Sequence, residues 1–182
     1  MKNIQKQLFF TVEQKVIKFL SANADKEYTE KEIGDLTETK KSAVNLALRS
    51  LSEEGIVKKR KVGRTSLYSA GTDNMVIKEL KVLQNILLIY PLIEKLKPEG
   101  QRVILFGSAA RGTNTPESDI DLFVEGNDID KIRKIVNGSE FGDKIQLIAK
   151  TPKEMLEINE QKPLFFQEIE KGKIIWENHG KQ

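Results

Sequence analysis

RVILFGSAARGTNTPESDIDLFV, residues 102–124, is the stretch that decides the fold of the second half of the chain. After Arg102 its first residues are apolar and predict a buried strand that ends at Phe106. Gly107 and Ser108 follow at once and predict a change from strand to a short helical turn, which ends at Arg111 and Gly112. A polar loop over residues 113–118 then leads to a second predicted strand, residues 119–124.

Asp119 and Asp121 are two residues apart on this second strand. Side chains alternate along a strand, so we expect both carboxylates on one side and Ile120, Leu122 and Val124 on the other. Carboxylate oxygens are hard ligands that suit Mg²⁺. Two such groups side by side suit two-metal phosphoryl transfer, in which the metal ions lie about 3.5–4 Å apart. An Asp-x-Asp pair alone is more often a solvent-facing strand surface.

The Gly107-Ser108 pair stands where a strand gives way to a helix. Glycine allows a phosphate to approach the backbone closely, and N–H groups at a helix start attract anions. The serine hydroxyl adds a donor. A glycine-serine pair alone indicates no more than a turn.

Together, the Gly-Ser pair and the Asp-x-Asp pair resemble the signature of the polymerase β-like nucleotidyltransferases, and GSAARGTNTPESDIDLFV resembles their minimal prokaryotic group. The resemblance implies that Gly107 and Ser108 hold a nucleoside triphosphate. It also implies that Asp119 and Asp121 are the catalytic residues and the ligands of two Mg²⁺ ions. For Arg111, a contact with phosphate and a surface ion pair remain equal alternatives.

The superfamily normally supplies a third carboxylate from a later strand, and here that strand is predicted at residues 144–149. Gln146 is the residue best placed for this position. An amide is neutral and cannot serve as a base. Asp143, just before the strand, is the alternative if the register differs. Slow or absent turnover is therefore an open outcome.

The first part of the chain has helical periodicity and ends in a basic hairpin. Thr29 and Glu32 form a capping-box pattern at the start of a second helix, and a third helix is predicted at about 40–53. Two β-prone runs flank Gly63. This order, with EGIVKKRKVGRTSLYSA at residues 54–70, resembles the winged helix-turn-helix of prokaryotic transcription regulators.

The resemblance implies that the third helix enters the major groove of DNA and that the wing lies along phosphates. A solvated basic hairpin that blocks edge-to-edge pairing, or a protein-interaction module, is the alternative. The expected DNA-binding residues are Lys40, Lys41, Ser42, Asn45 and Arg49 on the third helix, with Lys58, Lys59, Arg60, Lys61 and Arg64 on the wing.

Between these parts, residues 73–97 predict one long helix that is apolar nearly all round, with Val76, Leu80, Leu83, Leu87 and Tyr90 on one face. Such a helix is expected to be buried, either within one chain or in a homodimer seam. Pro91 is expected to kink or restart it.

The sequence thus predicts an α+β protein with a winged helix at 1–70, a linker helix at 71–98 and a mixed-sheet nucleotidyltransferase-like domain at 99–182. The chain has no cysteine and no apolar run near the roughly 20 residues of a membrane span, and MKNIQKQLFF at residues 1–10 lacks the apolar run of a secretory signal. We therefore expect a cytoplasmic protein that needs no membrane.

Three functions remain open at this stage. The first is an enzyme that transfers a nucleoside monophosphate from a nucleoside triphosphate to a hydroxyl with Mg²⁺. The second is a transcriptional regulator whose nucleotidyltransferase domain binds a nucleotide effector without turnover. The third is a domain that docks a protein partner.

Overall fold

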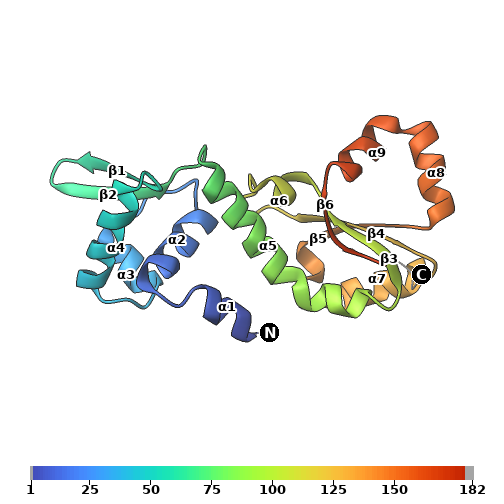
Figure 1. Cartoon of the computed structure of the whole chain (residues 1–182), viewed down its shortest axis with the longest axis horizontal. Helices are drawn as coiled ribbons and strands as arrows, with labels where there is room; N and C mark the ends of the chain where they lie inside the picture. Colours follow the sequence, from blue (N-terminus) through green and yellow to red (C-terminus); the bar gives the residue numbers. More distant parts are fainter. Residues whose placement is uncertain (1, 179–182) are drawn as a thin grey trace. The chain divides into compact units, whose positions relative to one another are not determined.

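The computed structural model describes residues 2–178, and the chain divides into two compact units, Met1–Lys81 and Val82–Gln182. The first unit consists of helices followed by a hairpin, and the second is built on a four-stranded sheet (Figure 1). The predicted α+β class is confirmed. No helix within residues 2–178 combines the length and apolarity needed to cross a membrane.

The first unit follows the predicted order of three helices and a wing, preceded by one further short helix. Its elements are α1 (Lys2–Leu8), α2 (Val12–Ala22), α3 (Glu30–Leu36), α4 (Lys41–Glu53), β1 (Val57–Val62) and β2 (Thr65–Ala70). The capping box predicted at Thr29 is present, because Thr29 Oγ1 accepts from the Glu32 N–H and Glu32 Oε2 accepts from the Thr29 N–H. It fixes the start of α3.

The core of this unit is the apolar face that α2, α3 and α4 share with the hairpin. Leu20, Ile33 and Leu48 are fully buried there, and Tyr68 of β2 packs against the same cluster. β1 pairs antiparallel with β2, with Val57 opposite Ala70 and Val62 opposite Thr65. The hairpin is therefore seated on the helices at its base, while its tip is exposed.

Helix α5 (Met75–Leu96) corrects one expectation and half of another. It continues through Pro91 without restarting, and its ribbon bends toward its C-terminal end (Figure 1), as a proline inside a helix allows. It is also not buried all round: the expected inner face includes Val76 and Leu83, which are exposed. The buried apolar residues lie on another face and are Ile77, Val82, Ile89, Leu92, Ile93 and Leu96.

The second unit is a mixed sheet with the strand order β5-β4-β3-β6. β3 pairs antiparallel with β4 and β6, and β4 pairs parallel with β5. Its elements after α5 are β3 (Gly100–Leu105), α6 (Gly107–Arg111), β4 (Ile120–Gly126), α7 (Ile129–Asn137), the 3-10 turn η1 (Gly142–Lys144), β5 (Ile145–Lys150), α8 (Pro152–Gln161), α9 (Pro163–Glu170) and β6 (Lys173–Glu177).

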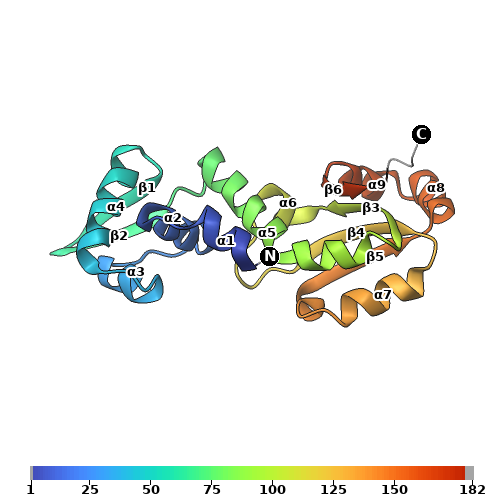
Figure 2. The same cartoon turned by 60° about the horizontal axis from the view of Figure 1, so that its bottom comes forward.

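Helices cover both faces of this sheet (Figure 2). On one face, Leu105, Leu122 and Val124 pack with α5 and α7 in the larger core. On the other, Ile104 and Phe123 pack with Met155 of α8 and Ile169 of α9. Because neighbouring side chains on a strand point to opposite faces, β3 and β4 each contribute to both clusters.

Candidate functional site

The two aspartates of the Asp-x-Asp motif lie at the start of β4. The strand begins at Ile120, so Asp119 stands one residue before it and is exposed, while Asp121 is half-buried within it. Ile120 and Leu122 point into the core with α5 and α7, as the alternation predicts. Asp121 therefore shares the opposite face with Phe123, on the side of the sheet that α8 and α9 cover.

Asp121 lies directly against Gly107. The Phe106 N–H donates to the Asp121 backbone oxygen at 3.1 Å, which joins the end of β3 to β4. Gly107 has φ +65°, and a Cβ atom there would overlap the Asp121 carboxylate. Glycine is thus required both for the backbone conformation and for the close approach of a carboxylate.

This contact changes the interpretation of Gly107. The space against its α-carbon, which the sequence suggested for a phosphate, is taken by Asp121. Since α6 has only five residues, its N-terminus alone makes no anion site. Contacts of Gly107 and Ser108 with a triphosphate stay a prediction.

The charges at this end of the sheet influence one another. Burial raises the pKa of Asp121 above its ordinary value, the negative charge of Asp119 raises it further, and Arg111 lowers it. A charge shifts the pKa of another group in this way only at short range. The two carboxylates and the guanidinium therefore form one electrostatic group.

Arg111 also makes an ion pair with α9. Its Nη1 donates to Glu168 Oε1 at 2.6 Å, and both side chains are well exposed. The ion pair that the sequence left as one alternative is present in the structure. A phosphate contact would require Arg111 to exchange Glu168 for the ligand, and it stays a prediction.

Gln146 occupies the position beside Asp121 on the neighbouring strand. In the parallel ladder, Asp121 is the register partner of Gln146, and Phe123 is that of Ile148. Register partners point to the same face, so Gln146 and Asp121 share one surface. Asp143 lies in the turn η1 before β5, outside the ladder.

The described part of the chain has no third acidic residue or histidine that joins Asp119 and Asp121 in a group able to hold a metal. The oxygens available at this surface are two carboxylates and the amide carbonyl of Gln146. They fit a hard cation that keeps waters or phosphate oxygens as its remaining ligands. They supply no third carboxylate as a base.

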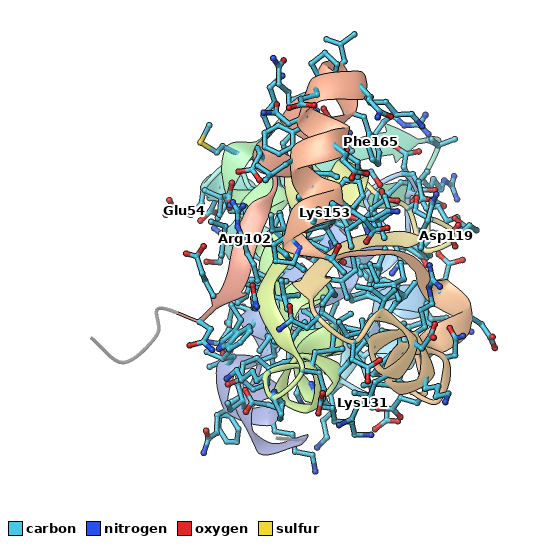
Figure 3. The ribbon with its side chains drawn as sticks, turned by 90° about the vertical axis from the view of Figure 1, so that its right-hand side faces the viewer. Glu54, Arg102, Asp119, Lys131, Lys153 and Phe165 are labelled. Carbon is cyan, nitrogen blue, oxygen red and sulfur yellow. The ribbon has the colours of Figure 1, made fainter. Side chains whose placement is uncertain are left out.

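A second charged cluster lies elsewhere on the same unit. Arg102 on β3 makes a bidentate pair with Glu170 on α9, at 2.7 and 2.8 Å. Asp119 and Arg102 are well separated in Figure 3. The Arg102–Glu170 pair anchors α9 on the sheet and is not part of the Asp-x-Asp site.

The sequence reasoning missed Asn85 of α5 and Glu168 of α9. Asn85 is 9% exposed and hydrogen-bonds both α6 and the loop before Asp119. A polar residue inside the apolar run of residues 82–93 was the available signal, because a buried amide needs partners. No pattern along the chain points to Glu168.

In the first unit, all ten residues predicted to bind DNA are at least partly exposed. The structure brings three of them together: Asn45 and Arg49 of α4 and Lys59 of β1 line one hollow of about 320 Å³ between helix and wing. The Lys59 ammonium lies 5.5 Å from the centre of the Tyr68 ring. Arg49 forms an ion pair with Glu53, and Asn45 Nδ2 donates a hydrogen bond to Glu30 Oε1 at 2.8 Å.

Lys58 and Arg60 point to the other face of the hairpin, since they alternate with Lys59. Both have acidic neighbours. Arg60 forms an ion pair with Glu27, in which Nε donates to Oε1 at 2.9 Å. The Lys58 Nζ lies 3.8 Å from Asp73 Oδ2. The basic residues of the wing therefore do not form one surface. Their contacts with DNA stay a prediction.

The geometry of the second unit agrees with a comparison against protein families. Residues 91–179, just under half of the chain, match the family model for the nucleotidyltransferase domain. These residues form a nucleotidyltransferase domain. The Asp-x-Asp pair, Gly107 and Gln146 all lie within it.

Solved structures with partial similarity include regulators and a protein assigned to the nucleotidyltransferases. ZitR of Lactococcus lactis, a single-residue mutant solved in complex with DNA, is 17% identical with a TM-score of 0.38, covering 46% of this chain and 60% of its own. BldR of Sulfolobus solfataricus, a transcriptional regulator, is 16% identical with a TM-score of 0.39, and the match covers 53% of this chain and 75% of the BldR chain. The protein assigned to the nucleotidyltransferases, also from Sulfolobus solfataricus, is 16% identical with a TM-score of 0.37, and the match covers 54% of this chain and 85% of the other.

The chain thus spans less than two thirds of the ZitR chain. Among curated proteins, none matches the sequence.

Proposed function

We propose that this protein binds a magnesium–nucleoside triphosphate complex at Asp119 and Asp121 of its nucleotidyltransferase domain and binds DNA through its winged helix. The observation that carries the nucleotide half is the Asp-x-Asp pair at the start of β4, with both charges close enough to affect the pKa of Asp121. Asp119 and Asp121 would hold the metal ion, which would neutralise the phosphates and orient them.

Binding without turnover is the better supported form of this function. Transfer would form a bond between the α-phosphorus and an acceptor hydroxyl, break the bond to the leaving pyrophosphate, and require a group that takes the hydroxyl proton. Gln146 stands beside Asp121 where a carboxylate would be needed, and its amide cannot take a proton. A nucleotide that binds without turnover would act as an effector of the DNA-binding unit.

Transfer of a nucleoside monophosphate to a hydroxyl is the second candidate, and the family match of residues 91–179 favours it. A direct test incubates the chain with Mg²⁺ and each labelled nucleoside triphosphate, and measures binding, label transfer and pyrophosphate. Saturable binding with no transfer and no pyrophosphate supports the effector. Pyrophosphate release that Asp121→Asn abolishes would establish the enzyme instead.

DNA binding is supported by the three-helix-and-hairpin order and by the exposure of the basic residues on α4 and the wing. Contacts with phosphates release counterions, so affinity should fall steeply with salt. Replacing Lys59, Arg60 and Arg64 by alanine should weaken binding and flatten its salt dependence. Unchanged affinity of this variant for random-sequence duplex DNA would remove the wing from the interface.

A further inference from the structure

Asn85 is a buried amide on α5, within the nucleotidyltransferase unit. The residue is 9% exposed, and its helix neighbours Val82 and Ile89 belong to the core that packs on the sheet. A buried polar group without partners is costly, whereas one that is fully bonded fixes the groups it joins. The partners of Asn85 therefore show what it holds in place.

One partner is the backbone of α6. Asn85 Nδ2 donates to the Ala109 carbonyl oxygen at 2.9 Å. In a longer helix this oxygen would accept from the Thr113 N–H, but α6 ends at Arg111 with Gly112 as its C-cap, and the Thr113 N–H donates to the Ser108 carbonyl oxygen at 3.1 Å. The last carbonyls of a helix need partners from outside it. Asn85 supplies that partner and ties α6 to α5.

The other partner is the loop that leads to Asp119. Asn85 Nδ2 donates to Asn114 Oδ1 at 3.1 Å, and Asn114 Nδ2 donates to Asn85 Oδ1 at 3.3 Å. Such reciprocal bonds fix both amide planes. At the other end of the loop, the Thr115 N–H donates to Ser118 Oγ at 2.9 Å, immediately before Asp119.

We propose that Asn85 is a positioning residue of the nucleotide site, an inference that rests on the proposed function. The Asn85 amide holds both α6 and the loop that leads to Asp119. The first residue of α6, Gly107, lies against Asp121. Asn85 thereby sets the distance between the two carboxylates without touching the ligand. Without Asn85, the loop is free to move and the pair no longer holds one cation in common.

The experiment compares the full-length chain with Asn85→Leu, which keeps the branched shape of the side chain with larger end groups and removes its hydrogen bonds. Asn159→Leu is the matched control, because Asn159 is an exposed residue on α8 of the same unit. Two quantities are measured: amide hydrogen exchange of residues 113–118, and the affinity for ATP, GTP, CTP and UTP with Mg²⁺.

Asn85→Leu should speed exchange in residues 113–118 and weaken nucleotide binding, each by about tenfold for a loss of one to two hydrogen bonds. Exchange in α7 should change less, which separates positioning from general destabilisation. Exchange in residues 113–118 equal to that of the control, or a uniform increase across the unit, would overturn the inference.

If Asn85→Leu does not fold, Asn114→Ala replaces it, because it removes the amide pair on the loop while Asn85 keeps its bond to the Ala109 carbonyl oxygen. The same local exchange and weaker binding are expected, and unchanged exchange overturns the inference. If the wild-type chain binds none of the four nucleotides, the proposed function fails. The exchange comparison then still decides whether Asn85 holds the loop.

Discussion

The carboxylate of Asp121 lies against the α-carbon of Gly107, in the space that any other residue at position 107 would fill with its Cβ atom. The two residues belong to different elements, α6 and β4. A backbone hydrogen bond from the Phe106 N–H, next to Gly107, to the Asp121 carbonyl oxygen holds these elements together. Gly107 is thus a packing partner of the candidate metal ligand. This relationship makes the glycine a sensitive probe of the site.

Gly107→Ala should destabilise the second unit and displace the Asp121 carboxylate. The φ of +65° and the overlap with Asp121 add, so we expect a loss of about 2–4 kcal/mol in the free energy of unfolding. Urea unfolding checks this value. In an Asp121→Ala background the same change should cost less, because the overlapping atoms are gone. Equal costs in both backgrounds would show that the contact is absent.

Gln146→Glu should make the thermal stability of the second unit depend more strongly on Mg²⁺. It would place a third negative charge beside Asp121, so the thermal midpoint without metal should fall and the rise on adding Mg²⁺ should exceed that of the wild type. Gln167→Glu on α9 controls for the added charge alone. A Mg²⁺-dependent rise no larger than in the wild type would place Gln146 outside the site.

Glu27→Gln should strengthen DNA binding. Glu27 pairs with Arg60 on the wing, and its loss frees the guanidinium for phosphate. One more phosphate contact steepens the slope of log affinity against log salt by about 0.9. Glu13→Gln, at an exposed position of α2, changes the net charge equally and should leave that slope unchanged. Fluorescence anisotropy with a labelled duplex measures both, and identical slopes for the two variants would contradict the prediction.

Glu154 should stabilise the second unit near neutral pH and lose this contribution in acid. Lys150 and the capping box at Thr151 lower the pKa of Glu154 from 4.5 to about 2. A carboxyl whose folded pKa is depressed stabilises the fold above its unfolded pKa, and this contribution is lost as the pH falls from about 4.5 toward 2. The difference in thermal midpoint between wild type and Glu154→Gln should therefore shrink over this range. A difference independent of pH would argue against the pairing.

Local patterns predicted many of the elements. The capping box at Thr29 and the alternation around Ile120 follow from spacing along one helix or strand, so their partners are close in sequence or fixed by a period of two. The placement of Gln146 beside Asp121 joins two separate strands, and it was implied by the resemblance to the nucleotidyltransferases.

Features that depend on distant segments could not be predicted. Glu27 meets Arg60 and Glu168 meets Arg111 only after folding, and no periodicity marks either acid. The buried face of α5 was misjudged because nearly every face of that helix is apolar, so the period does not identify one. The contact of Asp121 with Gly107 depends on how two strands end side by side.

The central claim is that Asp119 and Asp121 hold a metal–nucleotide complex together. Isothermal titration of the full-length chain with each nucleoside triphosphate, with Mg²⁺ and with excess EDTA, tests it most directly beside the variant Asp119→Asn/Asp121→Asn. The account predicts saturable binding at one site per chain that requires Mg²⁺ and is lost in the variant. Equal affinity in the variant, or binding that persists in EDTA, would contradict it.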